Sequence, residues 1–213
     1  MSKSKTSSDA KAESKGLLMI LSAPSGCGKT TLVDRLLKRH PDWVRSISST
    51  TRPPRPDEKD GSDYFFVTPA RFKEMEGKGE FLESARIFNH DYGTPKAELM
   101  RQVEEGKKII LAIDVQGMKQ IQKGIDKKIP LLTVFVLPPS IKVLRERLEG
   151  RKTEPPDEIQ RRIELAQEEI KAASFYDYTV VNQQLEPTVL EIEELVSQFQ
   201  NKRRKQTHVL RPS

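Results

Sequence analysis

A short apolar run, GLLMILS at residues 16–22, leads directly into the turn APSGCGKTT at residues 23–31. An apolar run of this length predicts a fully buried strand, and the apolar residues that follow have the spacing of one face of a helix over residues 30–40. A strand, a Gly-rich turn and a helix in this order let successive backbone N–H groups point at one anion, and the helix N-terminus adds partial positive charge. The turn, called here the phosphate loop, is therefore predicted to bind phosphate groups.

Individual residues of the phosphate loop suit this task. Gly26 and Gly28 let the backbone fold inward, and Lys29 supplies a mobile positive charge for the outer phosphates. The Thr30 hydroxyl is a hard oxygen ligand of the kind that Mg²⁺ prefers. GTPases, ATP-driven motors and small-molecule kinases all use such a loop, so the loop alone does not define the function.

The rest of the chain alternates between short apolar runs typical of strands and amphipathic segments typical of helices. Strands are predicted at 43–49, 108–114, 131–137 and 178–182, and helices at 97–106, 140–150, 159–174 and 187–200. Strands that alternate with helices favour an α/β fold, with a five-stranded parallel sheet flanked by helices.

Residues 49–95 interrupt this alternation with strands of their own and are predicted to form an inserted lobe. The segment 150–162 begins with GRKTEPPDE, which is predicted to be an exposed, turn-rich loop. Its place is similar to that of the loop that closes over the triphosphate in related small-molecule kinases, and this similarity implies a lid. The other predicted divisions are a core made of 16–48, 96–149 and 163–201, an N-terminal tail at 1–15 and a basic tail at 202–213.

The inserted lobe contains two arginines, Arg52 and Arg55, that are separated by two prolines. The prolines stiffen the backbone and fix the spacing of the arginines, and Tyr64 follows nine residues later. Two planar guanidinium groups and a phenol suit a phosphate monoester. The lobe is therefore predicted to bind a second phosphate-bearing molecule.

The run SISSTTRPPRPDEKDGSDYFF at residues 46–66 resembles the nucleoside-monophosphate signature of guanylate kinases. Later segments are similar to further landmarks of that family and follow in its order: EFLE (80–83), YGTP (92–95), IDVQG (113–117) and RLEGR (147–151). The resemblance covers roughly residues 16 to 200. It implies a P-loop NTPase-type fold and an enzyme that transfers the γ-phosphoryl group of ATP to GMP, giving ADP and GDP with Mg²⁺ as cofactor.

The resemblance also implies a GMP site. Its members are Ser48, Arg52, Arg55, Tyr64, Glu83, Tyr92, Thr94 and Asp114. Guanine presents its N1–H and 2-amino donors on one edge, and the carboxylate of Glu83 can accept both. Adenine has neither donor there, and such polar mismatches support discrimination on the order of 10⁴-fold.

On the ATP side, the resemblance implies contacts from the phosphate loop and from one residue beyond the last strand. These are Ser25, Gly26, Cys27, Gly28, Lys29, Thr30, Thr31 and, facing adenine, Asn182. Catalytic charges are expected from Lys29, Arg147, Arg151 and Arg162, and the metal ion from Thr30 and Asp114. Arg161, beside Arg162, is expected to be a solvated helix position.

The net charge of +6 suggests a nucleic-acid partner, but its distribution weakens that reading. Residues 1–16 carry +2 and residues 202–213 carry +5, so the body between them carries −1. We expect both tails to be disordered by composition. The expected partners are ATP and GMP, with dGMP as a further substrate, and no specific nucleic acid.

No apolar stretch reaches the roughly 18 residues that span a membrane, so no membrane partner is expected. The chain has one cysteine, Cys27, which cannot form an intramolecular disulfide, and this favours a reducing compartment, the cytoplasm. A monomer is expected. The position of Cys27 at a helix N-terminus near Lys29 suggests the hypothesis of a lowered thiol pKa and a reactive thiol, and the alternative is a small, inert side chain that fills space.

Three alternative functions remain open at this point. A guanylate-kinase-like domain can be a non-catalytic module that binds phosphorylated proteins, although Lys29 argues against this. The net charge leaves open a nucleic-acid-dependent ATPase. A kinase that acts on a different base is the third alternative.

Overall fold

The computed structural model describes residues 16–87, 89–150 and 155–209. The predicted tail at 1–15, Arg151 and residues 210–213 lie outside these ranges. At the centre is a five-stranded sheet in which every strand runs parallel to its neighbours. Its spatial order is β2 (Trp43–Arg45), β7 (Lys108–Leu111), β1 (Leu17–Ser22), β8 (Leu131–Leu137) and β9 (Tyr178–Val181). The predicted α/β fold is confirmed.

Strand β1 shows why the central sheet needs helices on both faces. Successive side chains of a strand point to opposite faces, and every residue of β1 is buried. Leu17, Met19 and Leu21 pack in one apolar core, while Leu18 and Ile20 pack in the other. The sequence GLLMILS is apolar throughout because both faces of this strand are covered.

Helices from different parts of the chain cover the two faces. The first core includes residues of α1 (Lys29–Arg39), α5 (Ile141–Glu149), α6 (Pro156–Lys171) and α7 (Leu185–Val209). The second includes residues of α3 (Lys96–Glu104) and α4 (Val115–Gly124). A 3₁₀ helix, η1 (Ala172–Phe175), joins α6 to β9. Within the described part of the chain, no helix is long and apolar enough to cross a membrane.

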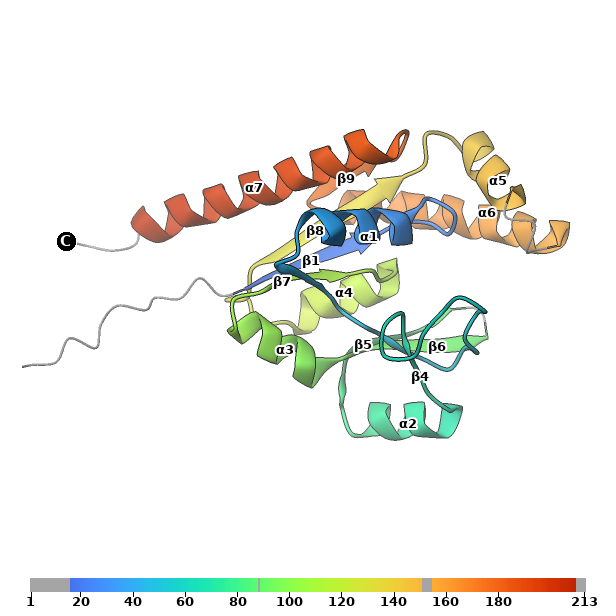
Figure 1. The fold of residues 1–213 in the computed structure, drawn as a ribbon, viewed down its shortest axis with the longest axis horizontal. Helices are drawn as coiled ribbons and strands as arrows, with labels where there is room; N and C mark the ends of the chain where they lie inside the picture. Colours follow the sequence, from blue (N-terminus) through green and yellow to red (C-terminus); the bar gives the residue numbers. More distant parts are fainter. Residues whose placement is uncertain (1–15, 88, 151–154, 210–213) are drawn as a thin grey trace, which may run out of the picture.

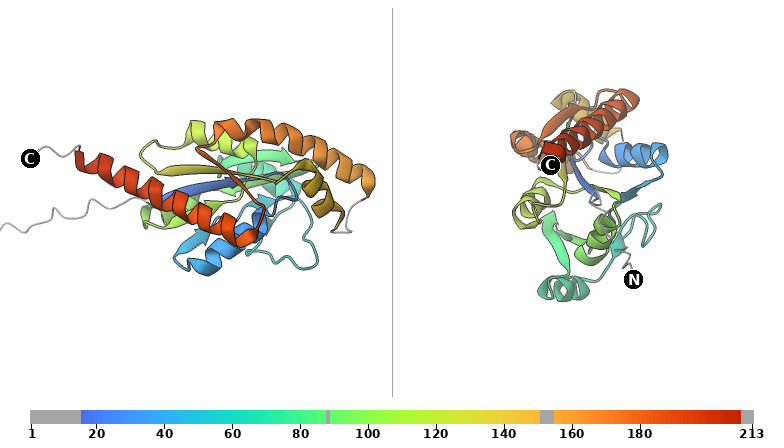
Figure 2. Two further views of the ribbon diagram at one scale, coloured as in Figure 1. Left: turned by 90° about the horizontal axis from the view of Figure 1, so that it is seen from above. Right: turned by 90° about the vertical axis from the view of Figure 1, so that its left-hand side faces the viewer.

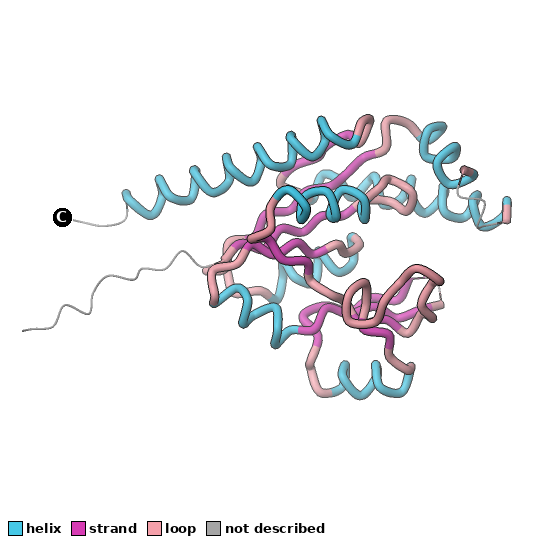
Figure 3. Tube along the Cα trace, viewed as in Figure 1, coloured by secondary structure: helices cyan, strands magenta, loops and turns pink. Residues whose placement is uncertain are grey.

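A second, four-stranded sheet lies beside the central one, and Figure 3 shows the two groups of strands separately. Its order is β4 (Phe65–Phe66), β3 (Ser49–Thr50), β6 (His90–Pro95) and β5 (Phe81–Ile87). Helix α2 (Pro69–Gly77) packs on β5 through Phe72 and Phe81, whose ring centroids lie 4.6 Å apart. All of these elements belong to the segment 49–95.

The structure corrects several sequence-based predictions within the body of the protein. The predicted strand at 43–49 is divided, because β2 joins the central sheet and β3 joins the second sheet. Strand β6 was not predicted, because HDYGTP contains few β-forming residues and depends on pairing with β5 and β3. Helix α4 was not predicted either, although Asp114 caps its N-terminus through Gly117 N at 2.8 Å.

The prediction of a disordered tail from residue 202 is wrong for residues 202–209. Helix α7 continues through Val209 and extends beyond the strands of the central sheet, as Figures 1 and 2 show. The Arg203 guanidinium lies 5.9 Å from the centroid of the Phe199 ring, one turn earlier. Lys, Arg and Gln are good helix formers, so a basic composition does not by itself end a helix.

Candidate active site

A cavity of about 640 Å³ lies between the carboxyl end of the central sheet, the second sheet and helix α6. Most of the residues that the sequence assigned to the two nucleotides line it. They are Ser25, Gly26, Gly28, Lys29, Thr30, Thr31, Ser48, Arg52, Arg55, Tyr64, Glu83, Tyr92, Asp114 and Arg162. The structure therefore brings side chains of the phosphate loop together with side chains of α6, which lies far from that loop in the sequence.

The glycines of the phosphate loop have the backbone conformations that the loop requires. Gly26 has φ 91° and Gly28 has φ 84°, a region that side-chain-bearing residues rarely adopt. A Cβ on Gly26 would also lie 2.9 Å from Leu148 Cδ2, and one on Gly28 would lie 2.8 Å from Asn182 Nδ2. Conformation and close packing thus both require glycine at these positions.

Two predicted site residues, Asn182 and Arg147, lie behind the phosphate loop and do not line the cavity. Asn182 is buried, and its Nδ2 donates to Cys27 O at 2.7 Å. Arg147 Nη2 donates in turn to Asn182 O at 2.9 Å. In this structure both side chains hold the loop, so the geometry does not favour the predicted roles facing adenine and the transferred group.

The prediction of a reactive Cys27 is wrong. Its side chain is fully buried in the core below the loop, and it does not line the cavity. Burial raises the pKa of the thiol to about 12, and the opposing influence of Arg147 and Lys29 is smaller. The helix N-terminus cannot compensate for the loss of water around a thiolate. Cys27 therefore contributes its backbone and its volume, and not a nucleophile.

Lys29 opens the first turn of α1 and faces the cavity. Its Nζ lies 3.4 Å from Ile113 O, two residues beyond the end of β7. Burial lowers the pKa of Lys29, while the carboxylates of Glu169 and Asp114 act in the opposite direction. The ammonium therefore lies between the phosphate loop and two acidic side chains.

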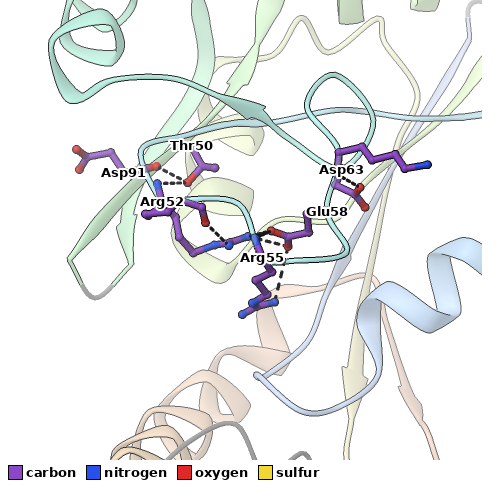
Figure 4. Close-up of polar contacts among 8 residues, drawn as sticks. Thr50, Arg52, Arg55, Glu58, Asp63 and Asp91 are labelled. Carbon is purple, nitrogen blue, oxygen red and sulfur yellow. Dashed lines mark hydrogen bonds and ion pairs between the residues drawn. The ribbon is translucent and has the colours of Figure 1, made fainter.

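The arginines of the inserted segment meet at one carboxylate, Glu58 (Figure 4). Arg52 Nη2 lies 2.8 Å from both carboxylate oxygens, and Arg55 N donates to Glu58 Oε2 at 2.8 Å. Burial acts to raise the pKa of Glu58, but the Arg55 N–H and the Arg52 guanidinium outweigh it and hold that pKa below its usual value. Glu58 thus connects Arg52 and Arg55, the two ends of the RPPR segment at residues 52–55.

Aromatic rings pack around the Arg52 guanidinium. Its Cζ lies 5.5 Å from the centroid of the Tyr64 ring and 5.9 Å from that of Phe66, within the range of cation–π attraction. The rings of Tyr64 and Tyr92 meet edge to face at 5.9 Å. Burial raises the pKa of Tyr64, so its hydroxyl keeps its proton and can donate to an anion.

Thr50 and Thr51, which precede Arg52, attach this loop to β6, and Figure 4 shows Thr50 beside Asp91. Thr50 Oγ1 donates to Asp91 O at 3.0 Å and accepts from Arg52 N at 3.2 Å. Thr51 Oγ1 accepts from Asp91 N at 2.9 Å. The TT pair of the sequence motif therefore fixes the backbone from which the arginines project.

Glu83 is a buried carboxylate at the base of the cavity, only 5% exposed. Thr94 Oγ1 donates to Glu83 Oε1 at 2.6 Å, so Thr94 lies behind Glu83 and does not line the cavity itself. Burial raises the pKa of Glu83 to about 7; the Thr94 hydrogen bond opposes this and the Asp114 charge adds to it. Thr94 acts on this carboxylate through both its hydroxyl and its backbone N–H, and a carboxylate has about four lone-pair sites, so sites remain for a ligand that carries donors.

Gly117 explains how α4 can approach Glu83 so closely. A Cβ at this position would lie 2.5 Å from Glu83 Oε2 and 3.0 Å from Glu83 Cδ. The residue is buried in the first turn of α4, whose start is fixed by Asp114. The glycine of the IDVQG motif thus leaves space for the carboxylate.

Arg162 reaches the phosphate loop from helix α6. Its Nη1 donates to Ser25 Oγ at 2.7 Å, and its Nε lies 3.5 Å from Glu158 Oε1. The neighbouring Arg161 is exposed, as expected, yet it also lines the cavity. The predicted contribution of Arg151 lies outside the described residues.

Sequence reasoning did not single out several residues that line the cavity. They are Ala85, Ile87, Asn89, His90, Glu158, Leu165 and Glu169. Glu58, which contacts Arg52, was not singled out either, although it lies within the motif at residues 46–66. The α6 residues Glu158, Arg162, Leu165 and Glu169 recur every three to four positions, so helical spacing would have placed them on one face once Arg162 was assigned.

A parallel α/β sheet with a phosphate loop, a lysine in that loop and a second set of arginines across one cavity defines a nucleotide-dependent phosphotransferase of the P-loop class. Comparison with known proteins gives the particular family. A family model described as guanylate kinase matches residues 15–199. The chain belongs to the guanylate kinase family.

Individual relatives agree with this assignment. A guanylate kinase of Clostridioides difficile is 45% identical over 188 residues, covering 88% of this chain and 90% of its own. One from a Nostoc species is 43% identical over 178 residues, covering 84% and 88% respectively. The crystal structure of guanylate kinase from Anaplasma phagocytophilum superimposes with a TM-score of 0.73 at 32% identity, covering 87% of this chain and 86% of that one.

Proposed function

We propose that this enzyme transfers the γ-phosphoryl group of ATP to GMP, with the phosphate loop holding ATP and the inserted segment 49–95 holding GMP. The observation that carries the proposal is the shared cavity, because Lys29 and Arg162 line it on one side and Arg52, Tyr64 and Glu83 on the other. Two strongly anionic reactants need alignment and charge neutralisation more than covalent assistance. A non-catalytic module that binds phosphoproteins would not need Lys29 in the phosphate loop or Arg162 beside it.

On the GMP side, Arg52, Arg55, Tyr64 and Tyr92 bind the phosphate, and Glu83 accepts the N1–H and 2-amino donors of guanine. Ser48 lines the same cavity and is a further base contact. Asp114, at the start of α4, faces both nucleotide sites. Because the deoxyribose lacks only one hydroxyl, we expect dGMP to be a second substrate.

The donor set at the loop fits Mg²⁺, which prefers oxygen ligands. Thr30 and Asp114 line the cavity and would hold the ion, directly or through water. When bound, Mg²⁺ neutralises charge on the β- and γ-phosphates. Segment 150–162 is proposed to act as a lid, and its described part forms the start of α6, which carries Arg162.

Further proposals rest on the sequence. We propose that the enzyme is cytoplasmic, because its single cysteine favours a reducing compartment, and that it is a monomer. We also propose that it has no specific nucleic-acid partner, because the positive charge lies in residues 1–16 and 202–213 while the body between them carries −1. Size-exclusion chromatography with light scattering tests the oligomeric state. ATP turnover that is unchanged by added DNA or RNA supports the last point.

A coupled assay of ADP release tests the main proposal, with GMP, dGMP, AMP and UMP compared as acceptors. We expect turnover with GMP and dGMP and little with AMP or UMP. Lys29→Ala should nearly abolish turnover while calorimetry still detects GMP binding. Full turnover in Lys29→Ala, or equal turnover with AMP, would contradict the proposal.

A further inference from the structure

Strand β5 is the last strand of the second sheet, so within the described part of the chain only one of its edges pairs with another strand, β6. A strand at the edge of a sheet presents backbone N–H and C=O groups that lack a strand partner. Ser84, in the middle of β5, has both of these groups occupied by a side chain from outside the inserted segment. That side chain is Gln120 of α4.

Gln120 contacts Ser84 through both ends of its side-chain amide. Ser84 N donates to Gln120 Oε1 at 3.2 Å, and Gln120 Nε2 donates to Ser84 O at 2.6 Å. An amide side chain carries both an acceptor and donors, so it can satisfy the backbone of one residue as a neighbouring strand would. The Ser84 hydroxyl is engaged separately, because it donates to Glu76 Oε1 on α2 at 2.7 Å. The two hydrogen bonds of Gln120, called here the amide clamp, therefore fix the backbone of β5 relative to α4.

The residue that the amide clamp holds is the direct neighbour of Glu83. Successive side chains of a strand point to opposite faces, and from β5 it is Glu83, Ala85 and Ile87 that line the cavity. Gln120 does not line the cavity, so it acts on the site only through the backbone of Ser84. The place of the Glu83 carboxylate thus depends on the backbone that Gln120 holds.

Helix α4 approaches β5 at two successive turns. Gly117 faces the Glu83 carboxylate, and Gln120, three residues later on the same side of the helix, holds Ser84. The start of the same helix is capped by Asp114, which also lines the cavity. One helix therefore determines where the carboxylates of Asp114 and Glu83 lie relative to each other.

We propose that Gln120 is a positioning residue for the recognition of guanine: its amide holds the backbone of Ser84 so that Glu83 meets the N1–H and 2-amino donors of the base. The proposal deepens the proposed function and rests on it for the identity of the base. The amide clamp itself belongs to the nucleotide-free protein. It can therefore be tested without any assay of activity.

The first test measures hydrogen exchange of the Ser84 amide by NMR in the nucleotide-free protein. Gln120→Met keeps the length of the side chain and removes both hydrogen bonds, so the Ser84 amide should exchange about tenfold faster than in wild type. The control is Gln122→Met, because Gln122 is exposed on a different face of the same helix, and this variant should exchange like wild type. Equal exchange rates in wild type and Gln120→Met would overturn the amide clamp.

The second test asks whether the amide clamp serves base recognition, with GMP and IMP compared as acceptors. The base of IMP has the N1–H donor but no 2-amino group, so a displaced Glu83 has less to lose with IMP than with GMP. Gln120→Met should therefore raise the KM for GMP by about tenfold and the KM for IMP by only about threefold, with the KM for ATP within about twofold of wild type. A purely structural role would lower Tm without changing the preference for GMP over IMP.

A second variant separates the two hydrogen bonds from the general polarity of the surface. Gln120→Glu still accepts from Ser84 N but has no donor for Ser84 O, so it should raise the KM for GMP at least as much as Gln120→Met. Wild-type KM values and wild-type preference for GMP in both variants of an active enzyme would overturn the positioning role. A wild-type enzyme that does not phosphorylate GMP would instead overturn the proposed function, and with it the role in recognition, even where the exchange experiment confirms the amide clamp.

Discussion

Arg162 on α6 donates a hydrogen bond to Ser25 Oγ in the phosphate loop at 2.7 Å, although 137 residues separate them in the chain. The guanidinium is half-buried and lies 3.5 Å from Glu158 Oε1 on the preceding turn. The helix whose first turns belong to the proposed lid thus contacts the phosphate loop in this structure. Arg162 therefore places a positive charge beside the loop that is proposed to hold ATP.

Replacing Arg162 should therefore affect turnover far more than substrate binding. A well-placed arginine contributes on the order of 10³-fold to phosphoryl transfer, so Arg162→Ala should lower kcat by about that factor. Arg162→Lys should recover little, because an ammonium cannot reproduce the planar fork of donors. Steady-state rates with saturating GMP measure the effect. Arg161→Ala is the comparison, with a smaller expected loss, and a kcat within tenfold of wild type in Arg162→Ala would contradict the assigned role.

GMP affinity should depend on the protonation of Glu83. Its carboxyl group has a pKa of about 7 in the nucleotide-free protein, so below that pH it is increasingly protonated and cannot accept both guanine donors. We expect the Kd for GMP to rise by about tenfold per pH unit below pH 7 and to be nearly flat above it. Isothermal titration calorimetry from pH 5.5 to 8.5 measures this dependence.

The phosphate of GMP also titrates, with a second pKa near 6, so a control must separate the two effects. Glu83→Gln keeps the size of the side chain and removes its titration. The ratio of wild-type to variant Kd should therefore change with pH in the manner of Glu83 alone. A constant ratio across the range would remove Glu83 from the base site.

We expect Gly117 to be as important for the binding of GMP as the Glu83 carboxylate that it faces. Gly117→Ala places a methyl group 2.5 Å from Glu83 Oε2, so either the carboxylate or the start of α4 must move. We expect the KM for GMP to rise by about tenfold or more, with the KM for ATP little changed. Gly124→Ala is a matched control on the same helix, because nothing lies within 4 Å of a Cβ there. Equal KM values for GMP in the two variants would show that Glu83 does not depend on this close approach.

The central sheet could be predicted because its strands are apolar on both faces and their helices carry regular spacing. The second sheet could be predicted only in part: strands were expected within 49–95, where β4 and β5 lie, but β3 is two residues long and β6 contains a glycine and a proline. Such strands form through pairing with distant partners and have little signal of their own. The sequence did not predict that α7 continues through residues 202–209, because a basic composition is also typical of disordered segments.

Within the candidate site, the motifs predicted which residues meet but not how each acts. Asn182 and Arg147 lie near the phosphate loop as expected, yet their hydrogen bonds support it from behind. Glu169 has no motif around it, and it lines the cavity because of the way α6 packs, which the sequence does not encode locally. Side-chain roles of this kind require the three-dimensional arrangement.

Glu58 should organise the phosphate site of GMP. Both of its carboxylate oxygens contact Arg52, and one of them accepts a hydrogen bond from the backbone N–H of Arg55, at the other end of the RPPR segment. Glu58→Gln keeps one acceptor and removes the charge, so we expect the KM for GMP to rise by about tenfold while the KM for ATP stays constant. Asp57→Asn, at an exposed neighbouring position, is the control. Tighter GMP binding in Glu58→Gln would instead identify the carboxylate as a competitor of the phosphate for Arg52.

Cys27 should be inert toward thiol reagents in the folded enzyme. With its pKa raised to about 12, only about 10⁻⁴ of the thiol is ionised at pH 8, whereas an unperturbed thiol is roughly one quarter ionised. Labelling with a colorimetric disulfide reagent should therefore be negligible in the native protein, with or without ATP, and should reach one thiol per chain in guanidinium chloride, because the chain has a single cysteine. Rapid labelling of the native protein that ATP slows would show that the loop opens and exposes the thiol. Cys27→Ser supplies the background rate against which both measurements are read.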